Sequence, residues 1–191
     1  MRIIAGTFRS RSLQAPPGLA TRPTSDRLRE TLFNVLAPRI QGAVFLDLYA
    51  GSGAVGIEAL SRGAVLVDFV ERAPAALAVM RANLTRLGLT AGFRIHAGSV
   101  ATVLRRMKPE PAAAFDLVFL DPPYDATEEY AATLGLLGGS LAALLTPGAM
   151  VIAEHRRKER LEIQYGALER TRLLEQGDAA LSFYQSSSAA D

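Results

Sequence analysis

Residues 46–60, LDLYAGSGAVGIEAL, begin as an apolar strand, turn at a cluster of glycines and continue as a helix. Gly51, Gly53 and Gly56 match the pattern G-x-G-x-x-G, in which small residues permit a tight turn and a close approach of the backbone to a ligand. Glu71 follows twenty residues after Gly51, at the end of the next apolar run. The stretch therefore predicts the first strand–turn–helix unit of an open α/β sheet, with a nucleotide-like ligand at the turn.

Short apolar runs alternate with helical stretches along most of the chain. Buried parallel strands are nearly continuous in β-branched and aromatic residues, and such runs occur at 43–49, 65–71, 93–97, 115–121 and 149–155. Helical patterns separate them at 54–62, 73–87, 99–107 and 126–145. This alternation predicts an α/β fold with a doubly wound, Rossmann-like sheet that is mostly parallel.

The C-terminal part departs from this alternation. Residues 168–176 and 179–186 are strand-like and are joined by Gly177-Asp178, which predicts an antiparallel hairpin. Residues 131–153 carry no charge, and a run of 23 such residues is long enough to span a bilayer. Four glycines and one proline interrupt the run, so we interpret it as a helix, a turn and a buried strand and expect no membrane segment.

Composition limits the class of protein further. A chain of 191 residues that is 49% hydrophobic is long enough for one globular domain with a substantial core. The absence of cysteine excludes disulfides, thiolate metal sites and the cysteine nucleophile used in pyrimidine-C5 methylation. It also fits a reducing, cytoplasmic compartment. His96 and His155 have no carboxylates at metal-ligand spacing, so no metal site is predicted.

The first forty residues form a basic region. They hold seven arginines against only Asp26 and Glu30, while the net charge of the whole chain is +2. A hairpin within 2–16, a loop and a helix are expected, so that residues 1–41 form a basic extension and residues 42–191 the α/β domain. Local positive charge favours a polyanionic partner, and a merely solvated surface is the alternative.

Asp47 bears on which ligand the glycine turn binds. It lies at the end of the first strand, four residues before Gly51, where its carboxylate would face the ligand. The glycine pattern alone favours a dinucleotide such as NAD, but a carboxylate at this place would repel pyrophosphate. S-adenosylmethionine carries an amino group and a sulfonium and no phosphate, and Glu71 suits the ribose hydroxyls of either ligand. We therefore expect S-adenosylmethionine; an NAD-dependent oxidoreductase is the alternative from another class.

The motif Asp121-Pro122-Pro123-Tyr124 follows the fourth predicted strand and so lies on the same rim of the sheet as the glycine turn. Proline has no N–H and a fixed φ, so the two prolines hold a stiff, extended segment. Asp121 and the carbonyl of Pro122 can accept both hydrogens of one amino group, and Tyr124 offers a face on which a base can stack. The motif predicts methylation of the exocyclic amine of a base.

These motifs resemble those of class I S-adenosylmethionine-dependent methyltransferases that modify exocyclic amines. The N-terminal sequence RIIAGTFRSRSL, followed by RPTSDRLRETLFNVL, is similar to that of the bacterial 16S ribosomal RNA guanine-N2 methyltransferase family, and the match covers nearly the whole chain. The resemblance implies rRNA methylation at a guanine N2 amine, on 16S RNA or on the assembling small ribosomal subunit. We expect a monomer. An N6-adenine methyltransferase acting on DNA or RNA shares the amine motif and is the nearest alternative.

The resemblance also implies the residues of the site. The target amine would be held by Asp121, Pro122, Pro123 and Tyr124. The cofactor would be bound by Asp47, Gly51, Ser52, Gly53, Glu71, Arg72 and Ser99. Ser99 stands where such enzymes commonly have Asp or Asn, so its bond to the adenine amino group is weaker or comes from its backbone N–H.

The arginines of the basic extension lie outside the predicted sheet and have few acids near them in sequence. We expect RNA phosphates to be bound by Arg9, Arg11, Arg22, Arg27 and Arg29.

Overall fold

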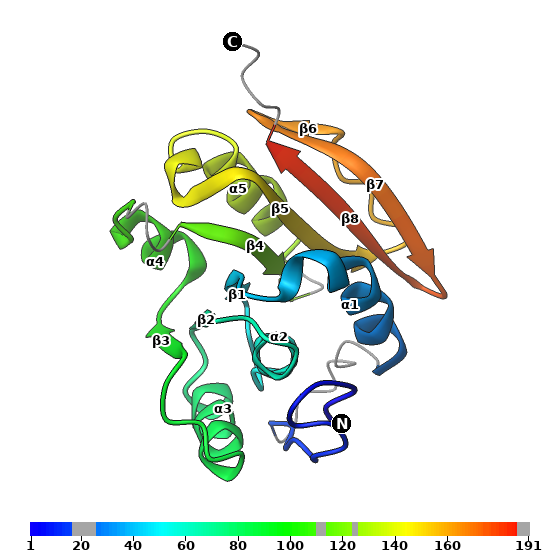
Figure 1. Ribbon diagram of the computed structural model, residues 1–191. Coiled ribbons are helices and arrows are strands. Elements are labelled where there is room, and N and C mark those ends of the chain that lie inside the picture. The colour runs from blue at the N-terminus through cyan, green and yellow to red at the C-terminus, as the bar shows by residue number, and fades with distance from the viewer. Residues whose placement is uncertain (17–25, 110–113, 124–125, 187–191) are drawn as a thin grey trace.

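The computed structural model describes residues 1–16, 26–109, 114–123 and 126–186. An eight-stranded sheet runs through it in the order β3-β2-β1-β4-β5-β8-β7-β6 (Figure 1). The strands are β1 Val44–Leu48, β2 Leu66–Glu71, β3 Phe93–Ala97, β4 Phe115–Leu120, β5 Leu145–Arg156, β6 Gln164–Tyr165, β7 Leu168–Gln176 and β8 Ala179–Ser186. The helices are α1 Asp26–Ile40, α2 Ala54–Ser61, α3 Pro74–Arg86, α4 Val100–Arg106 and α5 Glu128–Leu137, with a 3₁₀ helix η2 at Ala142–Leu144.

Strands β1 to β5 are parallel, and β8, β7 and β6 extend the sheet as an antiparallel edge. Helices α1, α2 and α3 cover one face of the sheet, whereas α4 and α5 cover the other (Figure 1). The prediction of a doubly wound, mostly parallel sheet with a C-terminal antiparallel hairpin is confirmed. The strand order reverses between β1 and β4, which is where sheets of this kind bind their ligands.

The segment between β4 and β5 differs from its prediction. The helix expected over 126–145 ends at Leu137, because two glycines follow, and η2 succeeds it. Strand β5 begins at Leu145, which already pairs with Phe115 before a bulge shifts the register. The uncharged residues 131–153 lie in these elements, and no helix among the described residues is long and apolar enough to cross a membrane. The two-residue strand β6 was not predicted.

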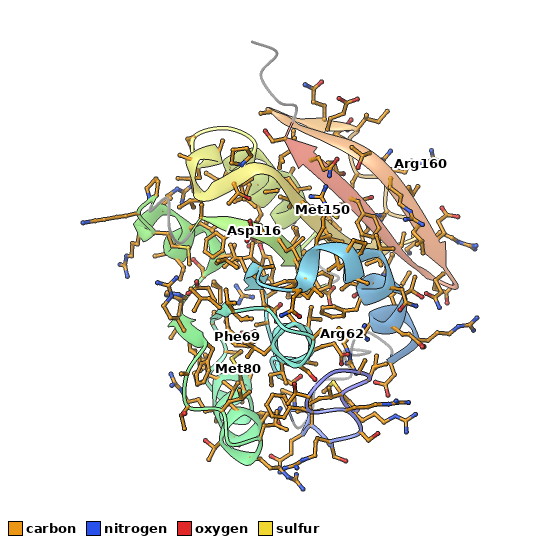
Figure 2. The ribbon with its side chains drawn as sticks, viewed as in Figure 1. Arg62, Phe69, Met80, Asp116, Met150 and Arg160 are labelled. Carbon is orange, nitrogen blue, oxygen red and sulfur yellow. The ribbon has the colours of Figure 1, made fainter. Side chains whose placement is uncertain are left out.

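The N-terminal segment, residues 1–16, packs into the same core as the sheet. It forms an antiparallel loop in which Arg2 and Ser12 make a β-bridge, so the expected hairpin is reduced to that bridge. Ile3 and Leu13 are buried in the apolar cluster that also contains Phe69, labelled in Figure 2. The segment therefore contributes to the stability of the α/β domain by hydrophobic burial.

Glu58 of α2 connects the N-terminal segment to the domain. Its buried carboxylate accepts hydrogen bonds from the backbone N–H groups of Ile4 (2.8 Å) and Ala5 (3.0 Å) and from Arg62 Nε (2.7 Å). Arg29 Nε of α1 lies 3.8 Å from the same carboxylate. A buried charge is tolerated only when it is paired and hydrogen-bonded, so these partners depend on one another.

Arg29 does not lie on the exposed side of α1. Its side chain has 0% exposure, and its Nη2 donates to the backbone oxygen of Arg2 and to Asp26 Oδ1, 3.0 Å away. Burial lowers the pKa of Arg29, and the charges of Asp26 and Glu58 oppose that shift. The prediction that Arg29 binds RNA phosphates is therefore wrong, because its guanidinium joins α1 and the N-terminal segment to α2.

Candidate active site

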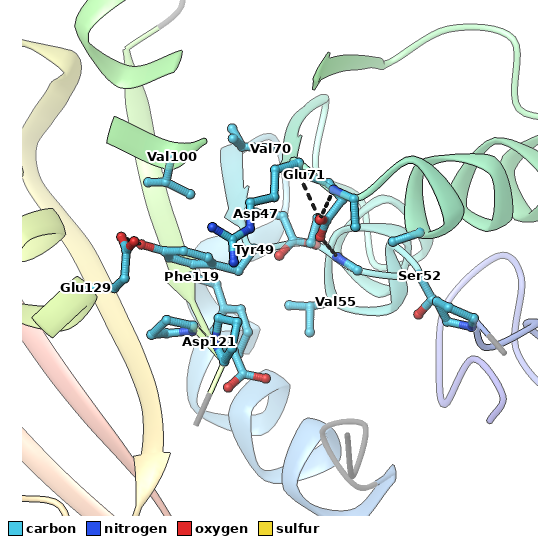
Figure 3. Close-up of a pocket in the computed structure, with 18 of the residues that line it drawn as sticks. Asp47, Tyr49, Ser52, Val55, Val70, Glu71, Val100, Phe119, Asp121 and Glu129 are labelled. Atoms are coloured by element: carbon cyan, nitrogen blue, oxygen red, sulfur yellow. Dashed lines mark hydrogen bonds between the residues drawn. The ribbon is translucent and has the colours of Figure 1, made fainter. Parts of the chain in front are cut away.

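A cavity of about 520 Å³ opens at the carboxyl ends of β1 and β4, at the point where the strand order reverses (Figure 3). The two strands are in register, with Asp47 opposite Phe119, so the glycine turn and the Asp-Pro-Pro segment border the same cavity. The predicted site residues that line it are Asp47, Gly51, Ser52, Glu71, Arg72, Ser99, Asp121, Pro122 and Pro123. Gly53 lies in the turn behind this lining, and Tyr124 lies outside the described residues.

The glycine turn has the backbone that the sequence pattern predicts. Gly51 and Gly53 adopt φ values of +56° and +79°, in the left-handed region that side chains disfavour. Gly56 serves a different purpose, since a Cβ there would lie 2.3 Å from a ring carbon of Phe69 on β2. The third glycine is thus required for close packing of α2 on the sheet.

Asp47 is almost fully buried beneath the turn. Its Oδ2 accepts a hydrogen bond from the Gly56 N–H at 2.8 Å, which satisfies a free donor at the start of α2. Burial raises the pKa of Asp47 to about 7, the Gly56 bond opposes that shift, and the charge of Glu71 adds to it. The side chain therefore has a structural role in the turn as well as a place in the cavity wall.

Glu71 holds the glycine turn to the end of β2. Its Oε2 accepts from the Gly51 N–H at 2.8 Å, and its Oε1 accepts from the N–H groups of Arg72 (2.8 Å) and Ala73 (2.7 Å), as the dashed lines in Figure 3 show. A carboxylate has about four acceptor sites, so Glu71 can also accept from a ligand hydroxyl. Its predicted contact with ribose stays a prediction.

Asp121 follows β4 as a half-buried carboxylate in the cavity wall. Burial raises the pKa of Asp121 well above its usual range, and the nearby charges of Glu154 and Asp47 raise it further. The carbonyl of Pro123 accepts a hydrogen bond from the Ala126 N–H at 2.9 Å, shortly before α5 begins. Asp121 thus lies between the end of β4 and the two prolines.

Tyr49 is a cavity residue that the sequence did not indicate. It has a φ of +60°, which is uncommon for a bulky side chain and costs free energy. Its hydroxyl donates to Glu129 Oε2 at 2.8 Å and is hydrogen-bonded to Thr133 Oγ1 at 2.9 Å, both on α5. Its ring lies beside Phe119 in Figure 3. Tyr49 therefore attaches the turn after β1 to α5. The feature that distinguishes Tyr49 is its positive φ, which cannot be read from the sequence.

Ser99 caps the helix that follows β3. Its Oγ accepts a hydrogen bond from the Thr102 N–H at 3.3 Å and donates one to Thr102 Oγ1 at 2.8 Å. Ser99 also borders the cavity. The capping bond occupies the hydroxyl, which favours the backbone N–H of Ser99 as the group that meets a ligand.

Acidic side chains predominate in the cavity wall. Among the described residues that line it, the charged ones are Asp47, Glu71, Asp121, Glu128, Glu129 and a single cation, Arg72. Such a wall favours a ligand with positive charge and disfavours one with a pyrophosphate.

The other predicted residues lie elsewhere. Arg9, Arg11 and Arg27 are exposed, and Arg22 lies outside the described residues. His96 does have a carboxylate partner, because its Nε2 lies 2.6 Å from Asp68 Oδ1 on the neighbouring strand.

That carboxylate also accepts from Arg94 Nε and Nη2, each at 2.8 Å. His155 is buried, with Nε2 2.9 Å from Ser182 Oγ, and burial lowers its pKa. No cluster that could hold a metal ion occurs among the described residues.

Comparisons with known proteins find relatives along the length of the chain. The family model described as "Conserved hypothetical protein 95" matches residues 1–185. A Bacillus subtilis (strain 168) protein provisionally named as an rRNA methyltransferase is 36% identical over 185 residues, which are 97% of this chain and 98% of that protein. Ribosomal RNA small subunit methyltransferase D of Escherichia coli (strain K12) is 40% identical over 124 residues, or 65% of this chain and 60% of that protein. The solved structure of an Escherichia coli protein, provisionally named as a methyltransferase, has a TM-score of 0.83 and 33% identity, with 97% of each chain covered.

Proposed function

Because the chain belongs to the family described as conserved hypothetical protein 95, we propose that it transfers a methyl group from S-adenosylmethionine to the N2 amine of a guanine in small-subunit ribosomal RNA. The names of the Bacillus subtilis and Escherichia coli relatives support rRNA methylation. The guanine and its N2 amine rest on the resemblance of the N-terminal sequence and on the Asp-Pro-Pro-Tyr motif.

The observation that carries the proposal is the charge of the cavity between β1 and β4. It is bordered by five carboxylates and one arginine, and its volume of about 520 Å³ lies within the range of small-molecule sites. S-adenosylmethionine is a cation of suitable size, whereas NAD carries a pyrophosphate that the same wall would repel. The chemistry of the lining therefore fits the methyl donor and argues against the oxidoreductase alternative.

Each wall of the cavity has a distinct part in this reaction. When bound, S-adenosylmethionine supplies a methyl group activated by its sulfonium. Asp47 and the turn at Gly51 would face the methionine portion, and Glu71 the ribose. Asp121, at the end of β4, would accept a hydrogen bond from the target amine and so orient the nitrogen lone pair.

The reaction needs little beyond this positioning. The target nitrogen accepts the methyl group in one displacement and becomes positively charged, so it then loses a proton readily. Asp121 is close to that nitrogen, and its raised pKa makes it a suitable first acceptor for the proton. Tyr124, outside the described residues, is proposed to stack on the base.

We assign residues 1–41 to RNA binding and residues 42–191 to methyl transfer. This is a division of function, since the N-terminal segment shares the hydrophobic core of the α/β domain. Exposed Arg9, Arg11 and Arg27 support the assignment. Ribosomal RNA as substrate supports a cytoplasmic location for the proposed reaction.

Methylation of unmodified 16S RNA and of purified small subunits with isotope-labelled S-adenosylmethionine tests the proposal. Nuclease digestion followed by mass spectrometry of the nucleosides should yield N2-methylguanosine. Labelled N6-methyladenosine would instead support the adenine alternative. If neither substrate acquires label while the protein binds S-adenosylmethionine in calorimetry, the RNA assignment is wrong and the cofactor assignment stands.

A further inference from the structure

Positive charge is concentrated in one stretch of the α/β domain. Residues 72–109, which form α3, β3 and α4, contain six arginines and one lysine and no aspartate or glutamate. Residues 110–191 contain thirteen acidic residues against six basic ones. Strand β3 forms one edge of the sheet, so this acid-free stretch concentrates positive charge at and beside that edge. The small net charge of the chain conceals this separation.

The proposed active-site cavity cannot itself attract an RNA backbone. Its wall carries five carboxylates and one arginine, so phosphates are repelled from its mouth. Binding of RNA therefore requires cations close to the cavity but outside it. Two neighbouring elements contribute to the cavity wall. The N-terminal segment contributes Met1, Ala15 and Pro16, and the start of α3 contributes Ala73 and Ala76.

These two elements form one continuous surface. Arg11 Nη2 lies 3.5 Å from the backbone oxygen of Arg86, at the end of α3. Asn83, buried on the same helix, accepts from the Gln14 N–H at 2.9 Å and donates to the Gln14 carbonyl at 3.1 Å. The N-terminal segment and α3 are thus joined side by side along one face of the molecule (Figure 1).

The cations on this surface are exposed. We call the exposed side chains Arg9, Arg11, Arg81 and Arg86 the α3 surface. Within the described part of the chain, no carboxylate lies at salt-bridge distance from any of them. Nitrogen-tipped side chains project outward in this region of Figure 2. A guanidinium that is exposed and away from carboxylates can bind a phosphate directly, and these four side chains meet that condition.

We infer that the α3 surface is the docking site for the phosphate backbone of the RNA substrate. This inference rests on the proposed function and adds Arg81 and Arg86 of α3 to the arginines expected from the basic extension. The N-terminal segment and α3, which carry this surface, also contribute Ala15, Pro16 and Ala76 to the cavity wall, so an RNA strand that runs along them can lead to the cavity. Charge complementarity favours nucleic acid, and an anionic membrane surface is the competing partner.

Helix α4 supplies a matched control. Arg105 and Arg106 are exposed and lie in the same acid-free stretch, but α4 covers the opposite face of the sheet from α3 (Figure 1). Replacing either pair of arginines with alanine removes two positive charges. A general attraction between RNA and a basic protein would respond equally to both changes, whereas a docking surface would respond only to Arg81→Ala with Arg86→Ala.

The experiment measures the affinity of the full chain for a 16S RNA fragment over a series of salt concentrations. Each lost phosphate contact lowers the slope of log affinity against log salt by roughly 0.7–0.9, so the α3 double variant should lose about 1.4–1.8. It should bind RNA roughly tenfold or more weakly at 0.1 M salt. The α4 double variant should keep the wild-type slope, and both should bind S-adenosylmethionine as the wild type does.

Three outcomes would overturn the inference. One is an unchanged slope in the α3 variant, and another is an equal decrease in both variants. The third is equally tight binding of the wild type to vesicles of phosphatidylcholine and phosphatidylglycerol, lost in the α3 variant, which would identify a membrane surface. Failure of the proposed function is distinct from these, because wild-type protein would then leave RNA unmethylated whatever the behaviour of the variants.

Discussion

The glycine turn after β1 and the N-terminal segment border the same cavity, but they are held in place by different means. In the turn, the conformation depends on glycines with positive φ and on carboxylates of the adjoining strands, Asp47 and Glu71. The N-terminal segment is held by side chains far along the chain, chiefly Glu58 and Asn83. Changes at the turn should therefore alter ligand binding with little effect on folding, and changes at the anchors should do the reverse.

The largest effect is expected at Glu58. Glu58→Ala removes the buried carboxylate that faces buried Arg29 and deprives the Ile4 and Ala5 N–H groups of their acceptor. Breaking a buried ion pair costs about 3–5 kcal/mol, and we expect a loss of that size in the free energy of unfolding, measured by urea denaturation. Glu30→Ala, on the exposed side of α1, is the control and should change it by less than about 0.5 kcal/mol. A small loss for Glu58→Ala would show that the segment is held by its apolar residues alone.

A change at Asp121 should have the opposite pattern, with a large loss of catalysis and little effect on folding. Asp121→Ala should lower kcat roughly 100- to 1000-fold, the range seen when one polar group that acts on the transition state is removed. Cofactor affinity, measured by calorimetry, should stay within a few fold. Asp121→Asn should retain part of the activity, because an amide oxygen can still accept from the amine. Wild-type turnover by Asp121→Ala would exclude this residue from the site.

The substitution Asp121→Asn also bears on the stability of the fold. Burial and the charges of Glu154 and Asp47 raise the pKa of Asp121, so its ionised form destabilises the folded state near neutral pH. Asp121→Asn removes the charge with little change of shape, and it should therefore leave the free energy of unfolding at pH 7 unchanged or raise it. A clear loss of stability would mean that Asp121 has a structural partner.

The contrast between the two regions also explains what could be predicted from the sequence. The glycine turn and the rim that contains Asp121 depend on local patterns: an apolar run, a residue with special backbone freedom and the order of parallel strands. The pairing of Arg29 with Glu58 joins residues far apart in sequence, and no periodicity distinguishes an inward arginine from an exposed one. The bond from His96 to Asp68 was missed for the same reason, since strand register decides it.

Glu71 should show an intermediate effect, confined to ligand binding and the turn. Glu71→Ala removes the acceptor for the Gly51 N–H and for any ribose hydroxyl. We expect S-adenosylmethionine to bind about 1–3 kcal/mol more weakly in calorimetry, the usual cost of losing hydrogen bonds to a charged acceptor. Thr90 is exposed and does not border the cavity, so Thr90→Ala is the surface control and should bind normally. Unchanged affinity in Glu71→Ala would remove this residue from the cofactor site.

The pH dependence of cofactor binding should be set largely by Asp47. Its pKa is raised to about 7, so its carboxylate is protonated below that pH and cannot attract a cationic ligand. Affinity for S-adenosylmethionine should rise with pH and level off above about 7, with a change of up to about tenfold per pH unit below it. Asp47→Asn should bind more weakly and lose this dependence. If the pH dependence persists in Asp47→Asn but disappears in Asp121→Asn, the carboxyl of Asp121 is responsible for it.

The free energy of unfolding should respond to Asp47 in the opposite sense. A carboxyl whose pKa is higher in the folded state than in the unfolded state holds its proton more tightly when folded, so stability falls as pH rises. The fall due to Asp47 should occur between its ordinary pKa of 3.8 and about 7. Denaturation of Asp47→Asn across this range should show a smaller fall than the wild type, and an identical one would exclude Asp47 as its source.

The smallest effect is expected at Asn83, where the two regions meet. Its side chain bonds the backbone of Gln14 and donates to the carbonyl of Ser52 in the glycine turn, at 3.0 Å. If the anchors and the turn are independent, Asn83→Ala should reduce only stability. We expect it also to weaken S-adenosylmethionine binding, by about 0.5–1.5 kcal/mol, because the turn loses a hydrogen bond that orients it. Thr85→Ala, exposed on the same helix, should leave both quantities unchanged. Reduced stability with wild-type affinity would show that the N-terminal segment and the cofactor turn share a cavity without influencing each other.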